Sequence, residues 1–215
     1  RSTLFPYTTL FRSLADRDTY FAEFNMGYNG SENFPKENRF GFFPAVALGY
    51  LISNEPFWNI DAIDVLKFRG SIGLVGSDVL PRRNNQEMRY GYLSTWKEGL
   101  GGYYFGFHPN FIPGVGEDQI GIYDLTWEKG LKKDIGIELK MFKNAISLEF
   151  DLFHENRTDI LIERKSLPSI IGFNAAPFAN MGTMVNHGIE TTLELSHKFN
   201  DLRSEEHTSE LQSLG

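Results

Sequence analysis

The chain has 215 residues, no cysteine and a formal net charge of −7 at pH 7. The lack of cysteine excludes a disulfide framework and a thiolate metal site, and the acidic balance disfavours nucleic-acid binding, which needs basic patches against phosphate. The sequence contains no run of about 18 apolar residues, so it predicts no spanning helix, although the half-apolar strands of a membrane barrel would leave only a weak hydropathy signal.

Both ends of the chain resemble translated sequencing-library adapters. Residues 1–13 read RSTLFPYTTLFRS and residues 203–213 read RSEEHTSELQS. We therefore expect residues 1–13 and 203–215 to be adapter-derived artefacts that form no domain and lie as loose tails, and residues 14–202 to be an internal piece of a longer protein. Removing both ends takes away three basic and three acidic side chains, so the net charge is unchanged. Genomic codons for these ends, found by resequencing the locus, would contradict this interpretation.

Two long strands are predicted between residues 39 and 78. Over 40–52, bulky side chains at every second position alternate with mostly small ones, as on the two faces of a strand. From residue 66 onward, an apolar face alternates with a polar one. Pro44 lacks an amide donor, so we expect a bulge or an edge position there, with the paired stretch beginning near Ala45.

Four further segments alternate in the same way, and three of them keep carboxylates on one face. In a soluble β-sandwich that face would contact solvent, whereas in a porin-like barrel it would line a water-filled lumen, with the aliphatic face toward lipid. The alternation by itself allows both architectures. The predicted strands are 19–28, 134–142, 145–155 and 187–199.

Connection lengths favour the barrel, because outer-membrane barrels have short turns at one end and long loops at the other. We place the predicted tight turn at Lys143 and Asn144 on the short side, together with a turn of middling length at 54–63. Two more strands are expected in the longest connection, for example 119–128. The long segments then all fall on the opposite side, and they are 29–38, 78–133 and 156–186.

Five phrases of the sequence occur in an informative order: RFGFFPAVALGYLISNEPF, LKFRGSIGLVGSD, TWEKGLKKDIGIELKMF, RTDILI and NMGTMVNHGIETTLEL. Together they resemble the carboxy-terminal barrel region of SusC/RagA-type TonB-linked outer membrane proteins, over nearly all of residues 21–199. The resemblance implies an all-β fold, an antiparallel transmembrane β-barrel fragment in the form of an open curved sheet. About six to eight long strands from a barrel of about 22 are expected.

The resemblance also implies a function. It indicates a partial TonB-dependent receptor that imports glycans or peptides across a Bacteroidetes-like, Gram-negative outer membrane. The implied partners are a SusD-like surface lipoprotein, TonB through an amino-terminal region not included here, an oligosaccharide or peptide substrate, and outer membrane lipid; no cofactor and no nucleic acid are expected. A non-transporting barrel, either adhesin or structural, stays open as an alternative, and an outer-membrane hydrolase is less favoured.

The sequence predicts no enzyme. The stretches GLGGYY and GVGEDQ lack the third glycine of a dinucleotide-binding loop, and Arg69 stands where a nucleophile elbow needs glycine. Carboxylates that alternate along a lumen explain pairs such as Glu149 and Asp151 without acid–base chemistry. We therefore expect no catalytic, cofactor-binding or metal-binding residue, and the substrate-binding residues are unknown. The histidines, which show no metal-ligand spacing, are His108, His154, His187 and His197.

Several polar and small residues have both an architectural and a functional interpretation. Glu190 is expected to line the lumen, beside Thr192 and Glu194, rather than to contact substrate. Trp127 and Glu128 are expected in an interfacial girdle rather than in a ligand platform. The glycines of the last phrase, Gly182 and Gly188, are expected to adopt positive backbone angles where a loop re-enters the wall. A small-residue lumen surface for a plug is predicted at Gly41, Ala45, Ala47 and Gly49.

Residues 90–111 form the best candidate for ligand contact, because aromatic rings pack against the apolar faces of sugars. Ordinary loop packing or a membrane-interface belt is favoured over that role, so no binding residue is named. The side chains concerned are Trp96, Tyr103, Tyr104, Phe105, Phe107 and His108.

Overall fold

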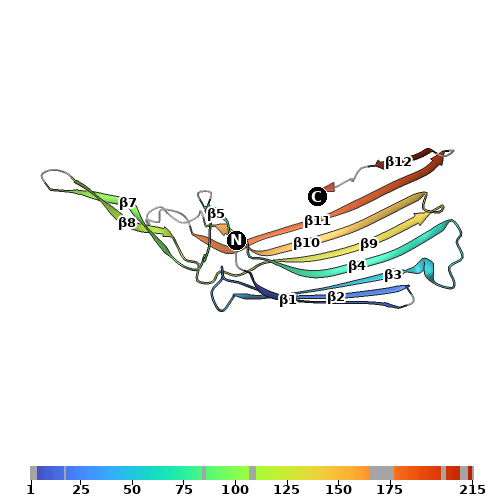
Figure 1. Ribbon diagram of the computed structural model, residues 1–215, viewed down its shortest axis with the longest axis horizontal. Coiled ribbons are helices and arrows are strands. Elements are labelled where there is room, and N and C mark those ends of the chain that lie inside the picture. Colours follow the sequence, from blue (N-terminus) through green and yellow to red (C-terminus); the bar gives the residue numbers. More distant parts are fainter. Residues whose placement is uncertain are drawn as a thin grey trace.

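The protein is an open, curved wall of long antiparallel strands (Figure 1). The computed structural model describes residues 4–16, 18–83, 86–106, 110–164, 177–199, 202–208 and 213–214. Within these residues, nine strands form one sheet, which confirms the predicted fold class. In spatial order they are β1 (Leu4–Asp16), β2 (Tyr20–Ser31), β3 (Phe40–Leu51), β4 (Ile63–Ser77), β9 (Glu128–Met141), β10 (Ile146–Glu163), β11 (Phe178–Phe199) and β12 (Leu202–Thr208), with β13 (Ser213–Leu214) also against β11.

Two antiparallel pairs stand apart from this sheet. They are β5 (Arg82–Arg83) with β6 (Gln86–Glu87), and β7 (Thr95–Phe105) with β8 (Asn110–Gln119). A 3-10 helix, η1 (Ile52–Asn54), follows β3. Among the described residues, no helix is long and apolar enough to span a membrane.

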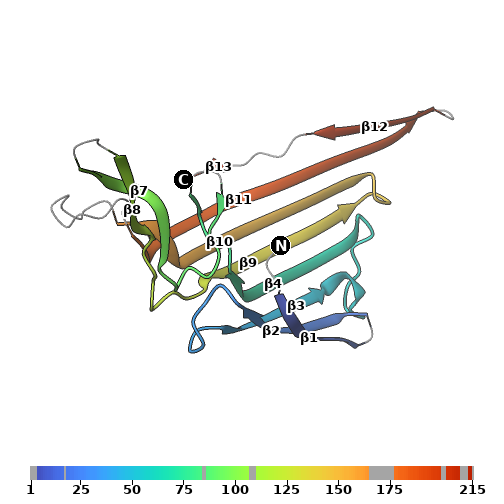
Figure 2. The ribbon, with the colours of Figure 1, turned by 60° about the vertical axis from the view of Figure 1, so that its left-hand side comes forward.

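The six predicted long strands are all present, as β2, β3, β4, β9, β10 and β11. Figure 2 shows them side by side with a common slant.

The long connections lie at one end of the wall, here called the loop end, and the short connections lie at the other end, here called the turn end. At the turn end, residues 142–145 connect β9 to β10: Lys143 and Asn144 have positive φ, 58° and 62°, and the Ala145 amide donates to the Phe142 carbonyl at 3.2 Å, which confirms the predicted tight turn.

Three strands are clearly longer than predicted. β9 begins at Glu128 instead of residue 134. β10 continues to Glu163 and β11 begins at Phe178, so much of the predicted loop 156–186 is paired strand. The apolar alternation ends earlier than the hydrogen-bond ladder, because backbone groups pair regardless of side-chain polarity.

The predicted strand at 119–128 is wrong. The connection contains two strand pairs instead, β5 with β6 and β7 with β8, and the chain from residue 120 to 127 is irregular. Its apolar residues Ile122, Leu125 and Trp127 do not follow a period of two, and all three are buried. They pack in a cluster instead of alternating across a sheet.

Pro44 causes no bulge on β3. The register with β2 runs without a shift from Gly30 against Phe40 to Tyr20 against Tyr50, so pairing on that side does not wait for Ala45. On the other side, pairing with β4 begins at Ala45 against Gly73, as predicted. Pro44, which has no N–H to donate, therefore stands where the β3–β4 ladder stops.

The ends of the chain do not lie as loose tails. β1 pairs along the whole of β2, and β12 pairs with the last part of β11. The outermost strands of an open sheet present unpaired N–H and C=O groups, and an extended segment at each end satisfies them.

The strand register separates apolar from polar side chains. Large exposed apolar residues share one face, here called the apolar face, and the opposite face carries most of the charges. Two pairs of aromatic rings on β2 and β3, each stacked with nearly parallel planes, lie at the two ends of the apolar face. At the turn end the ring centroids of Tyr20 and Tyr50 are 5.0 Å apart, and at the loop end those of Tyr28 and Phe40 are 5.3 Å apart. The apolar face includes Val46, Leu48, Phe68, Ile72, Ile135, Ile137, Leu152, Ile189 and Leu193.

A compact hydrophobic cluster, here called the loop core, lies under the long connections. Trp127 is 4% exposed, and its ring lies 5.0 Å from the ring of Phe34 and 5.2 Å from that of Phe43. The expectation that Trp127 belongs to an interfacial girdle is therefore wrong, because neighbouring aromatic rings cover it. The loop core consists of Phe34, Leu80, Met88, Ile122, Leu125 and Trp127.

Candidate functional site

The polar face of the wall is held together by an ion pair that crosses a strand. Arg69 on β4 donates from Nε and Nη2 to the two carboxylate oxygens of Asp151 on β10, at 3.1 and 2.5 Å. The intervening residue on β9 is Gly136, where a Cβ would collide with the Asp151 carboxylate and lie 2.6 Å from Arg69 Nε. Glycine is needed here because the fork of Arg69 has to pass over the β9 backbone.

A second ionic group lies nearer the loop end. Arg157 donates from Nε to Glu155 at 2.7 Å and from Nη1 to Glu128 at 3.4 Å. Lys132 Nζ also lies 3.9 Å from Glu155. The side chain of Glu128, expected in a girdle, instead forms part of this partly exposed group on the polar face. Charges of both signs therefore line the wall from β4 to β10, which keeps the polar face wettable without a large excess of one sign.

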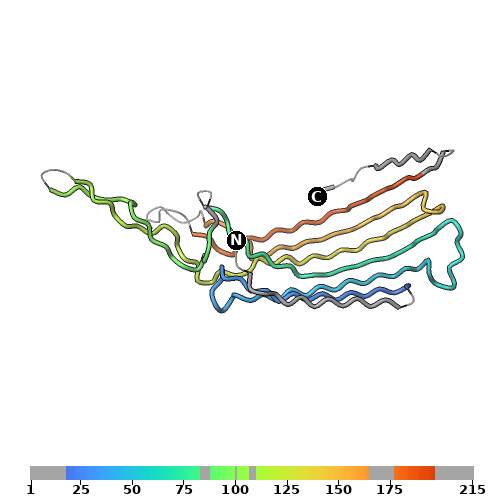
Figure 3. The backbone as a smooth tube through the Cα atoms, viewed as in Figure 1, coloured from blue at the N-terminus to red at the C-terminus, as the bar shows by residue number. Residues whose placement is uncertain are grey.

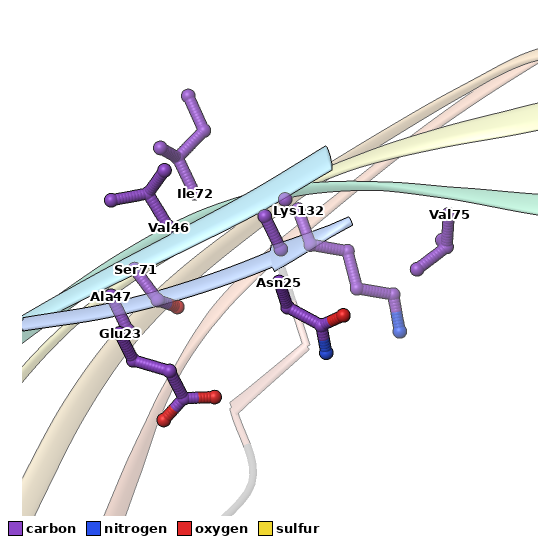
Figure 4. A pocket seen from close by; sticks show the side chains of 10 residues that line it. Glu23, Asn25, Val46, Ala47, Ser71, Ile72, Val75 and Lys132 are labelled. Atoms are coloured by element: carbon purple, nitrogen blue, oxygen red, sulfur yellow. The ribbon is translucent and has the colours of Figure 1, made fainter. Parts of the chain in front are cut away.

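Between β2 and β9 the polar face is hollowed into a groove of about 230 Å³. Its floor is made of small residues on β3 and β4, including Ala45, Ala47 and Gly73, and Figure 4 shows Glu23, Asn25, Ser71 and Lys132 projecting on the same side. Val46 and Ile72 point to the opposite side in the same view. Of the predicted small-residue surface, Ala45 and Ala47 thus lie among polar side chains, whereas Gly41 lies against the rings of Phe43 and Trp127. Glu190 also lies on the polar face, since it pairs with Asp151 in the register.

Asn180 on β11 fastens the loop core to the wall. Its Nδ2 donates to the carbonyls of Thr126 and Asp159, at 3.1 and 2.7 Å, and its Oδ1 accepts from the Thr126 amide at 3.1 Å. Asp159 has a φ of 59°, at a point where the β10–β11 register shifts.

Neither Gly182 nor Gly188 has a positive φ, contrary to expectation. Gly182 is required for space instead, because an added Cβ would lie 3.0 Å from Ile160 Cβ.

Replacing Asn180 with alanine should loosen this attachment. Three hydrogen bonds to backbone groups are lost, which we expect to cost about 1 to 3 kcal/mol of local stability. Hydrogen exchange of the full-length protein should then show weaker protection around Thr126, with the wall unchanged. Asn186→Ala is the matched control on the same strand, because the Asn186 side chain forms no hydrogen bond within the described residues. Equal loss in both variants would contradict the assignment.

The described histidines are not grouped into a metal-binding set. His154 and His187 are cross-strand neighbours with ring centroids 6.2 Å apart, and no group of three or more His, Asp or Glu within the described residues is arranged to hold a metal ion. His108 and Phe107 lie outside the described residues.

The hairpin β7–β8 carries the aromatic residues that the sequence singled out. Figure 3 shows it extending away from the loop end of the wall. Its rings are exposed: Trp96 and Tyr103 are each 68% accessible, and Tyr104, Phe105 and Phe111 are more than half accessible. The expectation of ordinary loop packing is therefore wrong for these five side chains.

The two-faced wall, with long loops at one end and short turns at the other, has the organisation of an outer-membrane barrel segment. Residues 13–209 match a family model described as TonB dependent receptor-like, beta-barrel. The chain belongs to this family. The barrels of TonB-dependent receptors lie in the outer membrane, so the apolar face is the lipid face and the polar face is the lumen face. The aromatic stacks at both ends of the lipid face fit interfacial girdles.

Curated relatives are TonB-dependent receptors. The chain is 29% identical over 204 residues to TonB-dependent receptor SusC of Bacteroides thetaiotaomicron, covering 90% of this chain and 18% of that protein. It is also 29% identical over 178 residues to TonB-dependent receptor P39 of Formosa agariphila, covering 82% of this chain and 16% of that receptor. The chain thus spans less than a fifth of the length of these relatives.

Solved structures confirm the fold. The RagAB peptide importer in its closed-closed state matches with a TM-score of 0.74 and 22% sequence identity, over 91% of this chain and 20% of that one. The same importer in its open-open state matches with a TM-score of 0.71. The wall is therefore similar to the corresponding part of a SusC/RagA-type barrel.

Proposed function

We propose that the chain forms part of the wall of a TonB-dependent importer of glycans or peptides in a Bacteroidetes-like outer membrane. A SusD-like surface lipoprotein would assist it at the loop end, and TonB would energise it through a part of the protein outside this chain. The observation that carries the proposal is the two-faced wall itself. An apolar face with aromatic ends suits lipid, and an ionic, grooved face suits a water-filled passage.

The lumen face supports passage rather than catalysis. Its strongest ion pair, Arg69 with Asp151, satisfies both charges, and neither group is left free to act as a nucleophile or base. The groove over Ala45 and Ala47 is open, which suits contact with an inserted segment or a passing solute better than a closed reaction site. The family consists of receptors and transporters, which is consistent with this choice.

Uptake by cells that express the full-length gene tests the proposal. Cells lacking the gene should lose uptake of a labelled oligosaccharide or peptide pool, and complementation should restore it. A protonophore should abolish the restored uptake, because TonB transmits energy from the inner membrane. Unchanged uptake in the deletion strain would favour a non-transporting barrel, and substrate hydrolysis without uptake would favour the hydrolase.

A further inference from the structure

The hairpin β7–β8 consists of a charged stem and a tip whose described residues, 102–106 and 110–113, are uncharged. In the stem, Lys97 and Glu98 lie opposite Gly116 and Val115. In the tip, Gly102 to Phe105 pair with Pro113 to Asn110, and the described tip residues include no acidic or basic side chain.

Both faces of the tip carry aromatic rings. The register places Tyr103 opposite Ile112 and Tyr104 opposite Phe111, so the two pairs lie on opposite faces. On one face the rings of Tyr103 and Phe105 have centroids 5.1 Å apart at 61°, and on the other those of Tyr104 and Phe111 have centroids 5.2 Å apart at 56°. All four rings are more than half exposed, so apolar surface is available on either side of the tip.

We propose that this tip binds neutral oligosaccharides, with Tyr103, Tyr104, Phe105 and Phe111 as stacking residues. The inference rests on the proposed import function and names its capture site and the favoured substrate class. Sugar rings present C–H faces that pack on aromatic rings, and their hydroxyl groups find partners in the two tyrosine hydroxyls and the Asn110 amide. A charged peptide would find no counter-charge among the described residues of the tip.

Lipid is a poorer occupant of the tip. The hairpin is a pair of two strands, so its outer backbone groups have no ladder partner, and a bilayer cannot satisfy such groups. The hairpin also extends beyond the loop end of the wall (Figure 1). Water and sugar hydroxyl groups, in contrast, both hydrogen-bond to free backbone groups.

The connection between stem and tip allows the tip to adjust to a bound chain. The stem is anchored, since Gln119 Nε2 donates to the Leu93 carbonyl at 2.9 Å and the Gly121 amide donates to Ser94 Oγ at 3.0 Å. The register then shifts between Glu98 and Gly102. In this bulge Gly99 and Gly101 have φ values of 83° and 74°, a conformation that favours glycine, and no packed neighbour restrains them, since an added Cβ would meet no atom within 4 Å.

Binding by the full-length receptor in detergent tests the proposal. The probes are soluble malto-, cello-, xylo- and manno-oligosaccharides, with charged peptides of similar length for comparison, and calorimetry gives the affinities. At least one sugar series should bind. Each single alanine variant of the four rings should weaken that binding roughly 2- to 10-fold, and the quadruple variant should abolish it. Tyr104→Phe should retain most of the affinity, because the ring is kept.

Controls distinguish stacking from general damage. Tyr123→Ala, at a residue 84% exposed outside the hairpin, should bind the sugars as the unvaried receptor does. Two results would overturn the proposal: the unvaried receptor binds no sugar series, or the quadruple variant binds sugars as well as the unvaried receptor does. A third would be a quadruple variant that keeps its sugar affinity but no longer binds a co-purifying protein or lipid vesicles. Uptake separates this result from the wider function: the quadruple variant should still import at saturating sugar, whereas a receptor that imports nothing contradicts the import function itself.

Discussion

Val46→Arg should prevent a large fraction of the full-length receptor from folding in lipid vesicles. Val46 lies near the middle of the β3 part of the lipid face, between the aromatic stacks at Tyr50 and Phe40. Arginine near the midplane of a barrel wall costs about 2 to 4 kcal/mol, because its charge loses water without gaining a partner. Urea titration with heat-modifiable gel mobility as the readout measures the loss.

A residue on the lumen face outside the groove provides the control for the lipid-face substitution. Thr192 on β11 lies on the lumen side, opposite Glu149 in the register. Thr192→Arg should therefore change stability by less than about 1 kcal/mol, because the new charge meets water and a carboxylate. If Thr192→Arg were the more damaging of the two, the assignment of the faces would be reversed.

Trp127→Ala should unfold the loop core while leaving the wall intact. The ring is buried against Phe34 and Phe43, and truncation of a buried tryptophan costs about 3 to 5 kcal/mol through lost burial and a residual cavity. The indole Nε1 is buried without a hydrogen-bond partner among the described residues, so truncation forfeits no hydrogen bond and removes an unsatisfied donor, which offsets a small part of this cost. Hydrogen exchange should show lost protection at Ile122, whose amide donates to the Gly91 carbonyl.

Two comparisons make the Trp127 result specific. Tyr123→Ala changes a neighbouring aromatic residue that is exposed, and it should alter local stability by no more than about 0.5 kcal/mol. Trp127→Phe should recover part of the protection, because it keeps a ring between Phe34 and Phe43. Normal exchange in Trp127→Ala would show that the loop core does not depend on this side chain.

Local alternation was sufficient to predict the strands and their faces. The side-chain period of two is visible within each strand, so Val46, Ile135 and Leu193 could be assigned to one face before any pairing was known. The tight turn at Lys143 and Asn144 was equally local. Extensions such as the end of β10 at Glu163 were missed, because the polar residues from Asn156 to Asp159 interrupt the apolar alternation, although the strand continues through them.

The contacts within the candidate site depended on information that lies far apart in the chain. Arg69 and Asp151 could each be placed on a polar face of a strand. Their ion pair could not be predicted, because it depends on the register of β4, β9 and β10, and a long connection separates β4 from β9. The one local signal was Gly136, a residue without a side chain within an otherwise bulky strand. Asn180 gave no signal, since its partners are backbone groups. The exposure of the hairpin rings depended on how the whole connection folds.

The strands at the two edges of the wall indicate what determines which segment pairs with a free sheet edge. The ladders β1–β2 and β11–β12 are built from backbone groups, and those groups are the same in every residue except proline. If the proposed adapter origin of residues 1–13 and 203–215 is correct, peptides that were never selected to form a barrel pair with strands of the barrel wall. The edge of such a sheet does not select a partner by sequence, so it pairs with whichever extended segment the connecting chain keeps nearby. The order of strands in a barrel must therefore be set by the length of the connections and the fit of the side chains, and not by the backbone hydrogen bonds.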